Sequence, residues 1–426
     1  MIKNLGERYS PLYFLAALGF GGMAVFFFMA FMHLTPHPGS LMPNFETIQD
    51  SFAQGDGFMK TVIVVAYIGM VAMLIVHFRL LVWNFREFTI FRGTDAYTKL
   101  RESNAEVTLM AIPLTLGMSV NGALVAAMAL VPNLTSILQT LMPFALLAYG
   151  AVGVLALYFM SRYLKRIIGA GFDFKQNGGL NQLLSSFAFA MVSVGLAAPA
   201  AMADATWVKL AALLSSLFFA SISVLLLLVF LPLGAMSMMR YGLSLQNSAT
   251  LWLPIPMLTL WGITLLRNRH AIQGLHDLGP AGPQDHQTTS IWVMLWLAGI
   301  IMTQLTFLGL GHIVMKKNGF YKDYVFGKNV ASPAAFTLVC PGVGISVVSM
   351  FFLRTGLIGN GLLTEGSFLF YAYLVGVAAI AAVTLWGALT IFRNQLSKNG
   401  ALASLPEIEQ ADDVEQSEDA DLLTVS

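Results

Sequence analysis

The stretch AAFTLVCPGVGISVVSMFF, from Ala334 to Phe352, does most to decide the fold of this 426-residue chain. It is apolar enough to cross a bilayer, yet Pro341 removes a backbone donor near its middle and Gly342 follows with bare backbone. Inside a membrane such a break is tolerated only where protein buries it or water reaches it. The stretch therefore predicts a helix that faces an interior cavity. The alternative is a packing kink, in which Cys340 acts as a small apolar side chain.

The composition is that of a polytopic membrane protein. Hydrophobic residues make up 57% of the chain and charged residues 11%, whereas soluble domains average about 25% charged residues. One cysteine excludes an internal disulfide, a thiolate metal cluster and a CxxC redox pair within one chain. The histidines show no metal-ligand spacing, and His33 and His37 are expected to be exposed loop residues. The sequence thus predicts no metal, no cofactor and no nucleic-acid partner.

Because about 20 apolar residues cross the hydrocarbon layer, the sequence predicts ten spans. The expected fold is an all-α membrane protein with ten transmembrane helices in five helical hairpins, and with kinked odd helices around a central pore. The predicted spans are residues 11–33, 59–83, 107–130, 137–161, 182–203, 207–238, 250–267, 290–315, 332–354 and 366–392. The sixth apolar run continues to Tyr241, so it is expected to tilt or to extend beyond the membrane past Pro232.

Three regions follow from this division of the chain. Residues 1–10 are expected to be a cytoplasmic N-terminus, and residues 11–395 the transmembrane domain. Residues 396–426 are expected to be an acidic, disordered cytoplasmic tail, because eight of the 22 acidic residues lie between Glu407 and Asp421.

Lysine and arginine predict the orientation. With the N-terminus inside, seventeen of the 23 basic residues fall on cytoplasmic segments and five on outer ones, with Arg79 left out near an inner span end. This bias favours two cytoplasmic termini, as an even span count requires. Arg267 and Arg269 lie on the wrong side and weigh against the seventh span. No cleavable signal peptide is predicted, because the first apolar run reaches His33 without a small-residue cleavage site.

Helix-breaking and small polar residues gather in the odd-numbered spans, which predicts that these spans line a lumen. The alternative is that small residues and prolines only let membrane helices pack closely. The residues expected to line the pore are Gly19, Gly22, Pro113, Gly117, Ser119, Asn121, Ser193, Pro254, Pro256, Thr259, Thr337, Cys340, Pro341, Gly342 and Gly344.

The odd spans carry no acidic or basic residue and no histidine near their middles. Such groups mark most proton-coupled carriers and pumps, so a neutral path favours passive conduction. Hydroxyl and amide donors that point inward favour a small inorganic or organic anion as the conducted species, whereas helix ends can favour either sign of ion. The other expected partner is membrane lipid.

The ninth span carries a resemblance to a known family. FTLVCP, from Phe336 to Pro341, and TLWLPIP, from Thr250 to Pro256, resemble the ninth-span and seventh-span motifs of the tellurite-resistance/dicarboxylate transporter family, which includes plant slow anion channels. The Cys-Pro-Gly-Val core is most similar to the TsoY group of that superfamily, whose members carry selenocysteine or cysteine at this point. The resemblance covers roughly residues 10–392.

The resemblance implies a homotrimer in which each protomer conducts small anions through its own pore, and the expected location becomes a bacterial cell inner membrane. It also implies a phenylalanine before the ninth-span proline that plugs the pore, and this sequence has Cys340 there instead. The first hypothesis is an anion channel or carrier rather than an enzyme, with Cys340 at the constriction. The alternatives are a redox protein or thiol sensor that uses Cys340, or a purely structural membrane subunit without a lumen.

Overall fold

The computed structural model describes residues 1–276, 287–328 and 330–403, and within these ranges the chain is an all-α bundle with no β-strand. Ten helices are long and apolar enough to cross a membrane, so the protein is a multi-pass membrane protein. The expectation of a disordered acidic tail concerns mainly residues 404–426, which lie outside the described residues.

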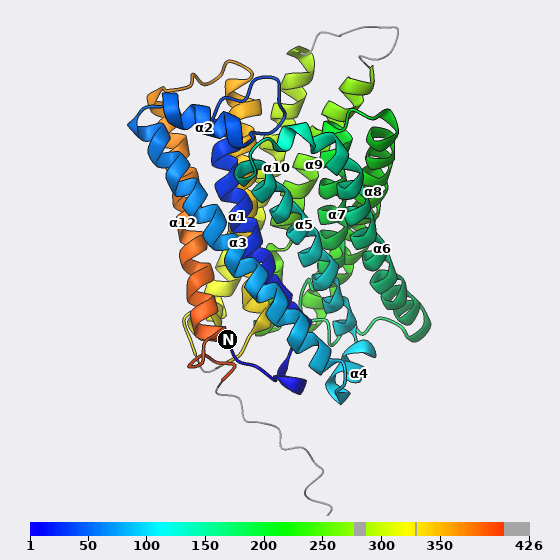
Figure 1. Ribbon diagram of the computed structural model, residues 1–426. Coiled ribbons are helices and arrows are strands. Elements are labelled where there is room, and N and C mark those ends of the chain that lie inside the picture. Colours follow the sequence, from blue (N-terminus) through cyan, green and yellow to red (C-terminus); the bar gives the residue numbers. More distant parts are fainter. Residues whose placement is uncertain (277–286, 329, 404–426) are drawn as a thin grey trace, which may run out of the picture.

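The long helices form two concentric layers (Figure 1). The inner helices are α1 (Phe14–Leu34), α5 (Ala111–Leu130), α7 (Leu183–Met202), α9 (Pro254–His276) and α11 (Val339–Phe351). The outer helices are α3 (Gly57–Phe91), α6 (Leu138–Ala170), α8 (Thr206–Tyr241), α10 (Gln287–Lys317) and α12 (Phe368–Leu396). In the most apolar window of each inner span 61–94% of the residues are buried, against 22–33% in each outer span.

The inner helices close into a ring. Each packs against the inner helix before and after it in the chain, and α11 returns to pack against α1. The outer helices then cover the ring, with α3 against α1, α8 against α7, α10 against α9 and α12 against α11. The predicted alternation of inner odd and outer even helices, as five hairpins, is therefore the observed architecture.

The two ends of the bundle differ. The N-terminus, the end of α12 and the short helix α4 (Asp95–Arg101) lie at one end, called here the terminal face, and α2 (Phe45–Gln54) lies at the other, the distal face (Figure 1). The outer helices carry exposed apolar side chains along their length, such as Leu147, Leu228 and Val383. Exposed Trp207 and Trp292 lie near the distal ends of α8 and α10, as in the aromatic belt of a membrane interface.

The breaks predicted in the odd spans lie at their terminal-face ends. Four inner helices follow a 3₁₀ segment: η2 (Pro11–Tyr13), η3 (Asn104–Met110), η5 (Leu245–Trp252) and η7 (Pro333–Leu338). Pro113, Pro254 and Pro341 then fall in the first turn of the α-helix, where a missing N–H leaves no bond unmade. The break in the ninth span is thus the change from 3₁₀ to α at Val339, and not a kink at Pro341. At the distal end α11 continues into the π-helix η8 (Phe352–Ile358).

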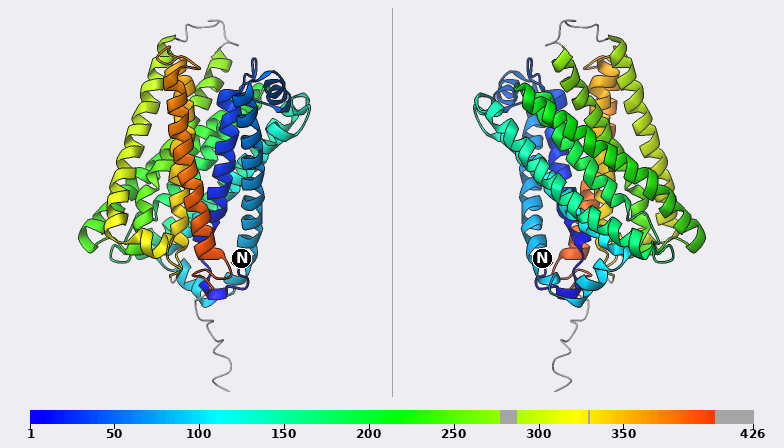
Figure 2. Two further views of the ribbon diagram at one scale, coloured as in Figure 1. Left: turned by 90° about the vertical axis from the view of Figure 1, so that its left-hand side faces the viewer. Right: turned by 90° about the vertical axis from the view of Figure 1, so that its right-hand side faces the viewer.

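The sixth apolar run is one helix, α8, which contains Pro232 and extends to Tyr241. Figure 2 shows α6 and α8 crossing the bundle obliquely. Such a tilt allows a helix that is longer than the bilayer is thick to remain within it. The seventh span does not end at residue 267, because α9 continues to His276 with Arg267 and Arg269 inside the helix.

One expectation about the distal end is wrong. His33 is not an exposed loop residue: it lies in the last turn of α1, is 7% exposed and packs edge-on against Phe351 at 4.6 Å.

The first ten residues pack against α3. Leu5 N–H donates to the buried Glu87 carboxylate at 2.8 Å, and the Tyr9 hydroxyl donates to Asn84 at 2.9 Å.

Reciprocal hydrogen bonds between serines join α7 to α8. Ser186 and Ser223 each donate to the other's carbonyl, at 2.6 and 2.7 Å. Ser193 and Ser216 do the same one heptad away on each helix, at 2.8 and 2.9 Å. Interhelical hydrogen bonds in membranes average about 0.6 kcal/mol and reach about 1.7 kcal/mol.

We expect Ser186→Ala with Ser193→Ala to lower the unfolding free energy by about 1 kcal/mol in total, because each change removes one donated bond of about 0.6 kcal/mol. The measurement is thermal unfolding of the purified protein in detergent. Ser221→Ala is the matched control, since Ser221 is exposed on α8 and donates only within its own helix. Equal melting temperatures for the double variant and the control would contradict this account.

Candidate functional site

The inner ring encloses a cavity of about 100 Å³, here called the central cavity. All five inner helices line it, with Gly22 from α1, Asn121 from α5, Met191 from α7, Thr259 from α9 and Cys340 from α11. A water molecule needs only about 10–15 Å³ of such volume, so the central cavity has room for several waters or one small solute.

Glycines let the inner helices approach closely around this cavity. A Cβ placed on Gly344 would lie 3.1 Å from the Cα of Pro256, so a side chain there would push α11 away from α9. A Cβ on Gly19 would lie 2.9 Å from the Cβ of Val339, which brings α1 against α11. Glycine, which has no side chain, therefore lets two pairs of neighbouring helices in the ring come into close contact.

Most of the polar groups near the cavity are engaged in holding the ring together. Thr259 donates to the Gly344 carbonyl at 2.8 Å and accepts from the Gln304 amide at 2.7 Å. The same Gln304 nitrogen lies 2.8 Å from the Ile255 carbonyl, so this buried outer-helix side chain bridges α9 and α10 beside the cavity. Asn121 is half-buried and has no hydrogen-bond partner in the described part of the chain, which leaves its amide available to a solute.

Toward the distal face the central cavity meets a second, wider space of about 510 Å³, here called the vestibule. Met42, Arg267 and Phe351 line both spaces and form the neck between them. The vestibule is lined by the 35–42 loop and by the distal ends of α1, α7 and α9 and of the π-helix η8. No carboxylate lines the vestibule in the described part of the chain, whereas Arg267, Arg354 and three histidines do.

Arg267 is the one charged side chain among the described residues that line the central cavity. Its two terminal nitrogens lie 3.9 and 4.0 Å from the sulfur of Met42, and no ion pair with a described residue is present. Arg354 differs, because its guanidinium pairs with Glu365 at 2.7 Å. A guanidinium carries five donors, and a charge inside a membrane protein is costly unless it is paired or wetted. The neck is therefore suited to hold an anion.

At its other end the central cavity is closed. Its last lining residues on α1, α7 and α11 are Leu18, Phe187 and Cys340. One turn closer to the terminal face, Phe14, Leu183 and Phe336 are fully buried in a packed apolar core. The path from the vestibule therefore ends at Cys340 in this conformation.

The structure brings seven of the predicted pore residues to the central cavity. They are Gly19, Gly22, Asn121, Pro256, Thr259, Cys340 and Gly344.

The other predicted residues lie elsewhere. Ser193 bonds to α8, and Ser119 faces α3. Gly342 packs against Thr384 of α12, on the outward side of α11. Gly117 packs against Met191, and a Cβ there would lie 2.8 Å from that side chain. The remaining four are buried in the first turns or 3₁₀ segments of the inner spans: Pro113, Pro254, Thr337 and Pro341.

Several polar residues of the site were not singled out in the sequence. His77 of the outer helix α3 is fully buried and joins three helices, with Nδ1 2.7 Å from the Ala17 carbonyl and Nε2 2.9 Å from the Ser119 hydroxyl. Gln304 bridges α9 and α10. Arg267, which the sequence marks only as a charge on the unexpected side of the membrane, lies at the neck. The position of His77 and Gln304 in the middle of even spans could have identified them in the sequence. A polar residue is costly on the lipid-facing side of a helix, so its presence there predicts a contact with the inner helices.

A thiol reaction at Cys340 receives no support from its neighbours. Cys340 is 7% exposed, and the described lining of the central cavity offers it no base or acid. The cationic Arg267 is also distant. It lies eleven residues, or about 16 Å along α9, beyond Pro256, which packs against Gly344 one turn from Cys340.

No protein-family model matches this chain, and no curated protein and no solved structure matches it.

We expect Cys340 to react slowly with a charged thiol reagent, because packed side chains close one end of the central cavity and the neck restricts the other. The rate is compared with that of Leu41→Cys in a Cys340→Ala background, since Leu41 is exposed in the vestibule. The vestibule cysteine should label at least tenfold faster, and Cys340→Ala alone should not label. Equal labelling rates for the two cysteines would show that the central cavity is open in solution.

Proposed function

We propose that the protein is a membrane channel or carrier for small anions. The anion enters the vestibule, passes Arg267 at the neck, occupies the central cavity beside Asn121 and crosses the closed end at Cys340. The observation that carries this proposal is Arg267, a guanidinium at the neck without a carboxylate partner among the described residues. A guanidinium in a water-poor constriction attracts anions and repels cations.

The charge of the vestibule supports the same sign of selectivity. Arg267 lines it without a carboxylate partner among the described residues, Arg354 lines it while paired with Glu365, and acidic side chains are absent from its described lining. A concave surface of one sign raises the local concentration of the opposite ion. Anions are therefore concentrated at the mouth before they meet the neck.

The closed end provides the gate in this proposal. Conduction requires the packed turn around Phe14, Leu183 and Phe336 to open. The 3₁₀ segments that lead into the inner helices are the place for such a change, because 3₁₀ hydrogen bonds have poorer geometry than those of an α-helix. Cys340, the last lining residue before this turn on α11, is the constriction at which side-chain volume sets the flux.

The proposal includes the setting expected from the sequence. The terminal face lies in the cytoplasm of a bacterial cell and the vestibule opens to the outside, in agreement with the bias of basic residues. The family resemblance adds a homotrimer with one path in each protomer, which sedimentation of the purified protein tests.

We expect Arg267→Gln to reduce anion flux at least tenfold, because it removes the charge that attracts the anion into the neck. Arg267→Lys keeps the charge and should retain most of the flux. The measurement is flux and reversal potential in liposomes, with a panel of anions and with cations as controls. Arg269→Gln is the matched control, since it makes the same change two residues further along α9 and lines neither space. A parental reversal potential in Arg267→Gln would refute its role.

The volume at Cys340 separates conduction from thiol chemistry. Cys340→Phe should reduce flux because it fills the constriction, whereas Cys340→Ala should keep or increase it. Cys340→Ser should conduct like the parent, because its volume is nearly unchanged. A thiol-dependent protein would instead lose activity in both the serine and the alanine variants, since neither supplies a sulfur nucleophile. Loss in both, with the fold intact, would replace the first hypothesis by the second.

A further inference from the structure

A pocket of about 540 Å³ opens at the terminal face between α4, η3 and the C-terminal part of α6. Four basic side chains line it: Arg101, Arg162, Lys165 and Arg166. The two acidic residues of the lining are Glu102 and Glu106, so the described pocket has two more positive than negative groups. It is separate from the central cavity and the vestibule, with which it shares no lining residue among those that the structure describes.

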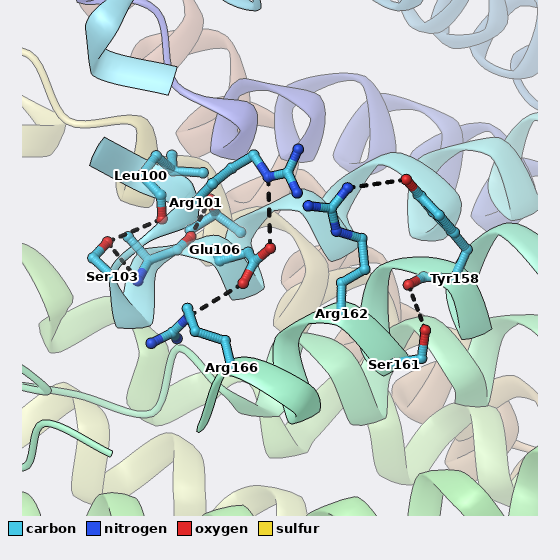
Figure 3. A network of polar contacts seen from close by, with 10 residues as sticks. Leu100, Arg101, Ser103, Glu106, Tyr158, Ser161, Arg162 and Arg166 are labelled. Atoms are coloured by element: carbon cyan, nitrogen blue, oxygen red, sulfur yellow. Dashed lines mark hydrogen bonds and ion pairs between the residues drawn. The ribbon is translucent and has the colours of Figure 1, made fainter. Parts of the chain in front are cut away.

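The buried carboxylate of Glu106 organises this pocket. It lies 3.2 Å from Nε of Arg166 and 3.8 Å from Nε of Arg101, so one carboxylate holds two guanidiniums (Figure 3). Both contacts use the Nε side of the guanidinium, and the terminal nitrogens remain free of Glu106. Nη2 of Arg166 is buried and has no acceptor among the described residues.

The other two basic residues have no carboxylate partner within the described ranges. Arg162 donates to the hydroxyl of Tyr158 at 3.1 Å, and both Arg162 and Lys165 are exposed. Figure 3 shows the guanidinium groups of Arg101 and Arg162 turned toward each other. Like charges that face one another in one pocket repel, and an anion between them removes the repulsion.

The sequence of side chains along α6 is the one expected for a site at the depth of lipid headgroups. α6 has 33 residues, which is about 50 Å of helix, whereas the hydrocarbon core is about 30 Å thick. The outward side of α6 carries exposed apolar side chains such as Leu147, Val154 and Tyr158, and the basic residues begin directly afterwards at Arg162. This change from apolar to basic along an outer helix marks the passage from acyl chains to phosphates.

We propose that this pocket binds the phosphate group of an anionic phospholipid. The phosphate accepts hydrogen bonds from Arg101, Arg162 and Arg166, with Lys165 as an additional point charge, and the acyl chains run along the apolar side of α6. Guanidiniums suit phosphate because their donors are planar and paired. A soluble organic phosphate shares this chemistry, but it would not gain from the exposed apolar surface beside the pocket.

A consequence concerns the inner ring. Glu106 belongs to η3, which leads directly into the inner helix α5. A lipid bound to the arginines that Glu106 holds therefore stabilises the terminal-face end of α5. This inference does not depend on which solute the central cavity accepts.

The test is lipid retention by the purified, delipidated protein, measured by native mass spectrometry with phosphatidylglycerol and with phosphatidylcholine. The parent should bind phosphatidylglycerol at least tenfold more tightly, because only this lipid brings a net negative charge. Arg162→Gln with Lys165→Gln should abolish the preference, whereas Arg162→Lys with Lys165→Arg should keep it. Lys317→Gln with Lys328→Gln is the matched control, since it removes two exposed charges elsewhere on the terminal face.

Two outcomes would overturn the proposal. One is an unchanged preference in the Arg162→Gln/Lys165→Gln variant, provided that thermal melting shows an intact fold. The other is displacement of phosphatidylglycerol by glycerol phosphate or inorganic phosphate at similar concentration, which would identify a soluble phosphate as the occupant. Unchanged binding in the control, combined with loss in the test variant, supports the lipid site.

Discussion

The lipid interior offers no hydrogen-bonding partner to a polypeptide, and the whole structure follows from that constraint. Backbone polar groups must be satisfied within the chain, so the membrane-spanning segments are helices. Any irregular backbone must then be buried inside the protein. The four 3₁₀ segments meet this requirement, because they precede inner helices and most of their residues are buried or partly buried. Polar side chains follow the same rule: the serine pairs between α7 and α8 and the Gln304 bridge all lie inward.

The same constraint explains why a closed ring can hold a cavity. Helices in a membrane gain little from apolar association with one another, so close contact between backbones is what holds them together. Gly344 and Gly19 allow that contact at two joints of the ring. Where larger residues such as Met118, Met191 and Val343 stand instead, the helices do not close completely and the central cavity remains. The cavity is thus a result of how small and large residues alternate around the ring.

Arg267 stands out against this background. A membrane interior penalises an isolated charge by roughly 2.5–3.5 kcal/mol or more, and a purely structural helix would not carry it there. The position of Arg267 between two spaces that can hold water lowers this cost, because its side chain lines the vestibule as well as the central cavity. The two spaces make a charge at this position tolerable, and the charge in turn makes the path between them suited to an anion. This is the physical basis for anion conduction as the proposed function.

The sequence alone determined the elements that depend on composition and length. Ten apolar runs predicted ten helices, and the small residues of the odd spans predicted that these spans lie inside, because only an interior position tolerates breaks and small polar groups.

The sequence could not determine the direction in which each residue points. A ninth-span glycine faces the cavity or the outer layer according to helix rotation, so Gly344 lines the central cavity and Gly342 meets Thr384. The sequence also could not show which residues meet when they are distant in the chain. Arg267, Met42 and Phe351 form the neck only because the ring closes. Glu106 likewise meets Arg166 only in the folded bundle. Packing fixes helix rotation, and packing is a property of the tertiary structure.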